Sequence, residues 1–215
     1  MNRLKKGLGL LIASLCVTSM NGNAIDFPAA PLRLDLIREN NVLPVFVIPK
    51  KDGEVYGNKI EAVFVSDDQD RTEITVVFSD ESHPNRIVDK LYRTYRYFRH
   101  GRTKDVESFY LKYSIPALNQ CEIPDSIEFP GSYSAAQQWN RFFQHHYHHE
   151  TVLQEFQTLA GRPIIYINTW NHLFSEQDTN AKISLDDTLL VLDYPMYIGS
   201  RKDVEKIIKG HTFQF

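Results

Sequence analysis

The most conspicuous chemical feature of the sequence is a group of four histidines, His145, His146, His148 and His149. On a helix, side chains four residues apart share a face, so His145 and His149 can present two imidazoles to one metal ion. Glu150 adds a carboxylate beside them, and zinc or copper suits such ligands. A catalytic zinc needs about three protein ligands, and His172 and Asp186 are only guesses for the third. The metal candidates are therefore His145, His149 and Glu150.

The same histidines also fit a purely structural role. His146 would project among the aromatic side chains of a helix as a neutral core histidine. The other three would lie near the C-terminus of that helix, where positive charge is favourable. The sequence lacks the His-Glu-x-x-His signature of zinc hydrolases. We therefore expect a structural cluster and no cofactor, and we keep zinc or copper binding as the alternative.

A second candidate site lies where an expected strand, residues 163–170, runs into a polar loop. Strand alternation places Tyr166, Asn168, Trp170 and His172 on one face. Aromatic rings with a few amide and imidazole groups are typical of small-ligand clefts. The neighbouring expected strand adds three more side chains to this candidate ligand-binding set, namely Asp193, Tyr194 and Tyr197. The alternative is a half-exposed sheet edge that leads into the loop.

The third feature is a basic helix, with seven basic residues against the single acid Asp89 between positions 86 and 104. Its candidate patch consists of Lys90, Arg93, Arg96 and Arg99. Such a patch would dock a phosphate-bearing headgroup or an acidic protein face. The alternative is a solvated helix face that is balanced by acids elsewhere. The apolar residues at helical spacing are expected to face the core; they are Ile87, Val88, Leu91, Tyr95 and Phe98.

The first 24 residues predict a cleaved secretory signal peptide. Arg3, Lys5 and Lys6 precede an apolar run of about a dozen residues, and small residues flank Asn23 before the expected cut near Ala24. The run is too short to cross a bilayer, and no later segment is long and apolar enough, so we expect no transmembrane segment in the mature chain. A periplasmic or secreted location follows from this prediction, with residues 25–215 as one globular domain.

Cleavage would shift the formal net charge from −3 to −6, because the removed segment carries three positive charges and no negative one. An acidic exported protein is a poor candidate for nucleic-acid binding. Only Cys121 would remain, so we expect no internal disulfide. Cys16 follows Leu15, which argues against lipidation. Nucleophile elbows, phosphate-binding glycine loops, dinucleotide fingerprints and Cys-x-x-Cys pairs are all missing from the sequence.

The order of expected elements is strands, helices, strands, helix. Strands are expected over 43–48, 60–65, 73–78, 163–170 and 188–194, and helices over 86–100, 105–113, 134–149, 151–160 and 200–209. Helices gathered in mid-chain predict an α+β fold. In that fold, a mostly antiparallel sheet from the N-terminal and C-terminal strands packs against a mid-chain cluster of amphipathic helices.

The sequence therefore favours an exported, soluble, non-enzymatic binding protein. Its partner would be another protein or a small amphiphilic ligand, with peripheral contact to an anionic surface as a further possibility. The alternative is an envelope hydrolase, metal-assisted or not, that uses the His145–His149 cluster or the Trp170–His172 loop. A purely structural envelope protein is the third interpretation.

Overall fold

The computed structural model describes residues 43–68, 71–113, 123–139, 149–180 and 188–208, and every structural statement below concerns these ranges. The signal segment, Cys121, His145 and Asp186 lie outside them. The described elements are β1 (Val45–Pro49), the π-helical turn η1 (Asp52–Tyr56), β2 (Ile60–Asp68), β3 (Arg71–Phe78), α2 (Arg86–His100), β4 (Asp105–Lys112), β5 (Ser126–Tyr133), β6 (His149–Leu153), β7 (Thr158–Leu159), β8 (Arg162–Ile167), β9 (Phe174–Ser175), β10 (Thr188–Val191), β11 (Met196–Ile198) and α3 (Arg201–Ile208).

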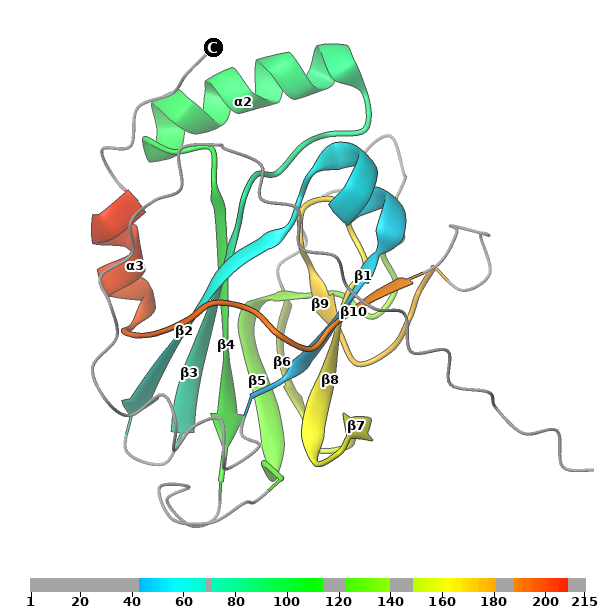
Figure 1. The fold of residues 1–215 in the computed structure, drawn as a ribbon, viewed down its shortest axis with the longest axis vertical. Coiled ribbons are helices and arrows are strands. Elements are labelled where there is room, and N and C mark those ends of the chain that lie inside the picture. Colours follow the sequence, from blue (N-terminus) through cyan, green and yellow to red (C-terminus); the bar gives the residue numbers. More distant parts are fainter. Residues whose placement is uncertain (1–42, 69–70, 114–122, 140–148, 181–187, 209–215) are drawn as a thin grey trace, which may run out of the picture.

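The strands form one curled sheet in the order β10-β1-β8-β9-β5-β4-β3-β2-β11, with β6 on β5 and β7 on β8 off that path. Most neighbours are antiparallel; β1 with β8, β2 with β11, and β5 with β9 are parallel. Figure 1 shows α2 lying across one end of this sheet and α3 beside β2. The sheet therefore presents one end to α2 and part of one face to α3.

Strand alternation divides the core into two clusters. On β3, Ile74, Val76 and Phe78 belong to the larger cluster, which is rich in phenylalanine. Val77 points to the opposite face, where Val204 and Ile208 of α3 cover a smaller cluster. Because both faces of the central strands are buried, these strands carry apolar side chains on both sides.

The predicted α+β fold with a mid-chain cluster of helices is wrong, because most of the described middle of the chain is β. Residues 105–112 form the central strand β4, and residues 149–153 form β6. In β4, Val106 and Phe109 face opposite sides of the sheet, so their three-residue spacing imitates a helical stripe. The expected helix over 105–113 therefore rests on spacing that a strand buried on both faces also produces. The helix expected over 151–160 is replaced by the strands β6 and β7, which lie off the main strand path and are largely exposed.

The expected helix at 134 also fails over its described residues. Ser134 accepts a hydrogen bond from the Gln137 amide, at 3.2 Å, as the N-cap of a helix would, but no helix follows over the described residues. Trp139 then forms an isolated bridge with Thr169, and its amide donates to Asn180 Oδ1 at 2.9 Å. A capping pattern fixes one local bond, and the tertiary partners of the following residues decide whether a helix continues.

Helices α2 and α3 form where the sequence predicts them. Asn85 caps α2 by accepting hydrogen bonds from the Ile87 and Val88 amides. Gly101 ends it in the left-handed conformation at φ 70°, which favours glycine. Ser200 and Asp203 bond to each other at the start of α3. These local signals position α2 over the end of β4, where the candidate site lies.

Candidate functional site

The candidate site lies where β5 separates from β4. The two strands pair at only three positions, from Tyr110 with Glu128 to Lys112 with Ser126. No pairing with β4 continues beyond Glu128, whereas β6 pairs along the opposite edge of β5 from Ile127, and β9 pairs with β5 at Tyr133. Pro130 stands at this departure and has no amide proton to donate to a neighbour. The Ser132 hydroxyl spans the gap, donating to the Ser108 carbonyl oxygen at 3.4 Å.

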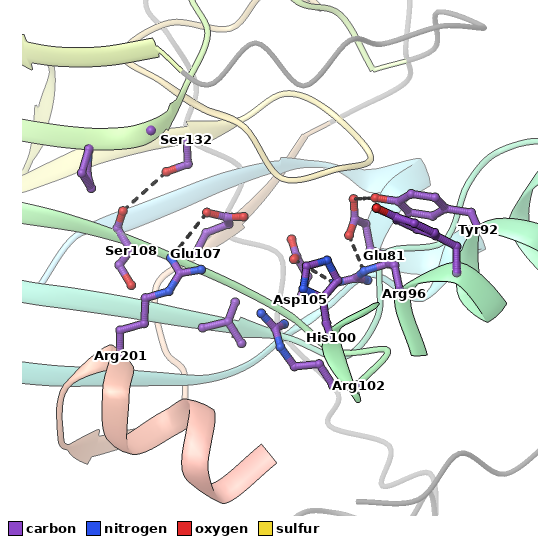
Figure 2. A pocket seen from close by; sticks show the side chains of 14 residues that line it. Glu81, Tyr92, Arg96, His100, Arg102, Asp105, Glu107, Ser108, Ser132 and Arg201 are labelled. Atoms are coloured by element: carbon purple, nitrogen blue, oxygen red, sulfur yellow. Dashed lines mark hydrogen bonds and ion pairs between the residues drawn. The ribbon is translucent and has the colours of Figure 1, made fainter. Parts of the chain in front are cut away.

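A cavity of about 550 Å³ opens at this separation. Its walls come from α2 and the turn that follows it, from β4, from β5 and from the start of α3. The lining polar and aromatic residues are Glu81, Tyr92, Tyr95, Arg96, His100, Arg102, Asp105, Glu107, Ser108, Ser132 and Arg201. Figure 2 shows the acidic and basic side chains from these different elements converging on one space.

Arg96 is the centre of a buried charge network at one end of the cavity. Its Nη1 lies 2.8 Å from Glu81 Oε2, and its Nη2 lies 3.0 Å from Asp105 Oδ1. The three side chains are between 4% and 8% exposed. Tyr92 donates its hydroxyl to the other Glu81 oxygen, Oε1, at 2.9 Å. Figure 2 shows this chain of contacts running from α2 to β4.

The network continues behind the cavity through His172. Its Nδ1 lies 2.9 Å from Asp105 Oδ2, and its Nε2 lies 3.9 Å from Asp52 Oδ2. The imidazole stacks on the Phe78 ring with centroids 3.7 Å apart and is fully buried. His172 also has a positive φ of 56°, which is uncommon for a residue other than glycine. It therefore belongs to the scaffold that fixes Asp105 and does not reach the cavity itself.

A second group of charges lines the other side of the cavity. Arg102 Nη2 lies 3.0 Å from Glu205 Oε1, and Arg201 Nε lies 3.9 Å from the same oxygen. Glu107 Oε2 lies 3.8 Å from Arg201 Nη1. The Arg201 side chain is 39% exposed, whereas that of Glu107 is 16% exposed. Glu107 is therefore mostly buried beside a distant and partly solvated cation.

The pKa values of the neighbouring carboxyl groups are shifted in opposite directions. Burial, together with the charge of Asp105, raises the pKa of Glu107 to about 8 and also raises that of Glu81. Burial alone would raise the Asp105 pKa as well, but the His172 hydrogen bond and the Arg96 charge outweigh it and lower that pKa. At neutral pH, Asp105 is ionised and Glu107 mostly holds its proton.

The cavity lining carries equal numbers of acidic and guanidinium side chains. The acids are Glu81, Asp105 and Glu107, and the guanidinium groups are those of Arg96, Arg102 and Arg201. His100 also lines the cavity, but burial and nearby arginines lower its pKa, so it stays neutral at pH 7. The lining is therefore balanced in formal charge, and at neutral pH Glu107 is the carboxyl whose pKa of about 8 leaves it mostly protonated.

The predicted ligand-binding set is not assembled into one cleft. Tyr194 is buried with its hydroxyl on the Pro44 carbonyl, at 2.7 Å, and Tyr197 stacks on Phe64. Asn168 is held by the loop through Gln177 and Asn180, while Asp193 and Tyr166 lie elsewhere, exposed and half-buried. Trp170 packs edge-on against Tyr92. The expected alternation fails because β8 ends at Ile167.

The predicted basic patch is divided by the structure. Arg96 is buried in the network, and Arg93 pairs with Asp80 and Asp89. Lys90 and Arg99 remain exposed on α2. The helix therefore directs one part of its positive charge inward and another part to solvent.

The described part of the predicted metal set is His149 and Glu150, two adjacent, exposed residues of β6. Adjacent strand residues point to opposite faces, so these two do not converge. Over the described ranges, no group of three or more His, Cys, Asp or Glu side chains is arranged to hold a metal ion.

The sequence prediction missed Glu81, Asp105 and Glu107, the carboxylates of the site. A signal for two of them exists in the alternation of Asp105 and Glu107 with Val106 and Ser108. That alternation indicates a strand with two acids on one face, and the helical interpretation of the segment concealed it.

Comparisons give no relative for this chain: no protein-family model matches it, and neither curated proteins nor solved structures give a match. Among the helices that the structure describes, none is long and apolar enough to span a membrane.

Proposed function

We propose that the protein is an exported binding protein whose cavity takes a small polar organic cation of the ammonium class. Export rests on the signal-peptide pattern of residues 1–24. The ligand class rests on one observation, which is that the mostly buried Glu107 carboxyl beside a cavity of about 550 Å³ has its nearest cation 3.8 Å away. An uncompensated acid in a confined space either holds a proton or binds a cation.

The cavity offers the groups that recognise an ammonium ion. The Glu107 carboxyl is mostly buried and has its nearest cation, Arg201, 3.8 Å away. Ser108 and Ser132 bring hydroxyl oxygens, and Tyr92 and Tyr95 bring aromatic rings to the same lining. Aromatic rings attract organic cations through their negative faces. Together these groups would solvate a charged amine and leave room for a short organic body.

The proposal predicts that protons are released when the cation binds. A bound cation favours the ionised form of Glu107, whose pKa of about 8 keeps it mostly protonated at pH 7. Binding should therefore release close to one proton per cation at pH 7. For the same reason, affinity should rise with pH until Glu107 is ionised in the free protein, because no proton then has to be displaced.

Isothermal titration calorimetry with ethanolamine, choline and agmatine tests this proposal, with ethylene glycol as the neutral probe. Titrations in two buffers of different ionisation enthalpy count the released protons. Glu107→Gln should weaken cation binding by about ten-fold or more and abolish the proton release. Glu54→Gln, which changes an exposed glutamate of η1, is the matched control. Cations that fail to bind, or that bind equally to Glu107→Gln, would disprove the proposal.

A second candidate function is acid–base hydrolysis, favoured by the opposite pKa displacements of Glu107 and Asp105. Carboxyl pairs with separated pKa values are typical of acid–base sites. In this alternative, neutral Glu107 is the proton donor, in place of the histidine cluster or the Trp170–His172 loop. Turnover of model esters, amides or glycosides that disappears in Glu107→Gln would support hydrolysis. Saturable cation binding without turnover supports the binding protein.

A further inference from the structure

Helix α2 carries an apolar stripe that is largely exposed to solvent, with Tyr95 at the edge where the stripe meets the cavity. Four side chains make up this outward stripe, and more than half of the surface of each is exposed. They are Ile87 (75% exposed), Leu91 (70%), Tyr95 (57%) and Phe98 (82%). At 3.6 residues per turn, the four lie within an arc of about 80°. The sequence predicts these residues as the core side of the helix, and that prediction is wrong.

The polar network explains why the stripe faces outward. Tyr92 and Arg96 lie on the other side of α2 and reach Glu81 and Asp105, both of which are buried. Rotating the helix to bury the stripe would bring these polar partners into solvent and break the buried ion pairs. The inner contacts therefore hold the apolar stripe at the surface.

Basic residues border the outward stripe. Arg86 and Lys90 lie along one border and Arg99 along the other, and all three are exposed. The only acid of the helix, Asp89, is on the inner side, where it accepts from the His83 amide and pairs with Arg93. Over the described residues, no acidic partner is found for Arg86, Lys90 or Arg99. The exposed charges of α2 are thus all positive.

We infer that α2 is a docking surface for an anionic lipid bilayer. Helices that lie in the bilayer interface bury an apolar stripe at the level of the headgroups and place Lys and Arg beside the phosphates. The outward stripe supplies the apolar part, and Arg86, Lys90 and Arg99 supply the positive border. This inference does not rest on the ligand proposed for the cavity, although Tyr95 belongs to both surfaces.

Charge complementarity favours a lipid surface over a second copy of the chain. Two copies that met through the outward stripe would bring identical positive borders together, and like charges across an interface oppose association. An anionic bilayer instead attracts each border residue, with about a five-fold gain in partitioning per cation. The protein carries net negative charge, so the rest of its surface is repelled and the docking is oriented by α2.

Co-sedimentation with vesicles tests the inference. The sample is the protein purified after export, and its mass identifies the form that is used. Vesicles contain phosphatidylcholine with roughly one-third phosphatidylglycerol, or phosphatidylcholine alone. The charge variant Lys90→Glu with Arg99→Glu should lose about ten-fold or more in binding to the anionic vesicles. Its matched control, Lys59→Glu with Lys202→Glu, reverses two exposed lysines away from α2 and should lose much less.

The apolar part of the docking surface has its own pair of variants. Leu91→Glu with Phe98→Glu should abolish vesicle binding, whereas Val55→Glu, at another exposed apolar residue, should not. All of these sites are solvent-exposed, so circular dichroism should show that the variants fold. High salt should weaken binding of the unmodified chain, because ions screen the cationic border.

A fluorescence readout reports on α2 alone. Trp139 and Trp170 are 0% and 4% exposed, so their emission should change little on docking. Phe98→Trp places an indole in the outward stripe, and its emission should shift to shorter wavelength with anionic vesicles but not with neutral ones. No shift, or an equal shift with both vesicles, would overturn the inference. A dimer that dissociates in Leu91→Glu with Phe98→Glu, without vesicle binding, would overturn it in favour of a second copy.

Discussion

Arg96 has 4% of its surface exposed, and two carboxylates hold its terminal nitrogens. A guanidinium keeps its proton at any ordinary pH, so its burial requires negative partners within hydrogen-bond reach. Each of these carboxylates has a second partner, Tyr92 for Glu81 and His172 for Asp105. Removing Arg96 would leave two buried carboxylates without the cation that compensates them.

Arg96→Met should therefore lower the free energy of unfolding by about 3–5 kcal/mol, the usual cost of breaking one side of a buried ion pair. Arg99→Met is the matched control, because Arg99 is exposed on the same helix, and its effect should stay within about 0.5 kcal/mol. Urea denaturation followed by circular dichroism gives both values. Equal effects for the two variants would show that Arg96 is not held as described.

At the scale of the element, α2 is an amphipathic helix with its apolar side outward. Its inward side is held by hydrogen bonds and ion pairs to Glu81, Asp80 and Asp105. Hydrophobic burial therefore contributes little to the attachment of this helix. The residues of the outward stripe should consequently matter little for folding.

Leu91→Ala and Phe98→Ala should each change the free energy of unfolding by no more than about 0.5 kcal/mol. The comparison is Phe109→Ala, which removes a fully buried ring of the larger core and should cost about 3–5 kcal/mol. Denaturant titration of the three variants measures the difference. A loss of about 2 kcal/mol or more at Leu91 or Phe98 would place the outward stripe in a packed interface.

At the scale of the whole molecule, the charge network joins distant parts of the chain. Asp52 belongs to η1, His172 to the loop before β9, and Glu205 to α3, yet all connect to the cavity side chains. Proton binding at the site is therefore coupled to global stability. Because the Glu107 pKa is raised from 4.5 to about 8, the folded chain keeps a proton there that the unfolded chain releases.

The free energy of unfolding should fall as the pH rises from about 5 to about 8, because the folded state binds more protons over this range. Glu81 acts in the same direction, and Asp105, with a lowered pKa, acts in the opposite sense only at acid pH. Urea denaturation along this range should show a decrease of the order of a few kcal/mol. Glu107→Gln should flatten the decrease, and Glu54→Gln should not. Parallel curves for Glu107→Gln and the unmodified chain would contradict the raised pKa.

The sequence predicts the bounds of local elements better than it predicts their tertiary contacts. The bounds of α2 follow from helical spacing, the Asn85 cap and Gly101, all of which are local. Its orientation does not follow, because the carboxylates that draw Arg96 inward come from elsewhere in the chain. The helix expected over 105–113 is β4 because a strand buried on both faces shares its apolar spacing.

The candidate site was only partly within reach of the sequence. Arg96 and His172 stand out, but as members of a basic patch and of a ligand cleft, not of one buried network. Glu107 has no motif around it, and its chemistry depends on the separation of β5 from β4. Such a separation is a property of pairing, which single-strand patterns do not report.

The strand order also determines when the fold can be completed. Residues 188–208 supply both ends of the strand path, β10 against β1 and β11 against β2, and they supply the helix over the smaller core. The bond from the Tyr194 hydroxyl to the Pro44 carbonyl spans 150 positions. Contacts so distant in sequence slow folding, because the chain must lose the entropy of closing long loops before the stabilising contacts form. In a chain that has not yet been synthesised as far as residue 188, one edge of β1 and one edge of β2 therefore lack their strand partners. The sheet can be completed only after β10 and β11 have been made.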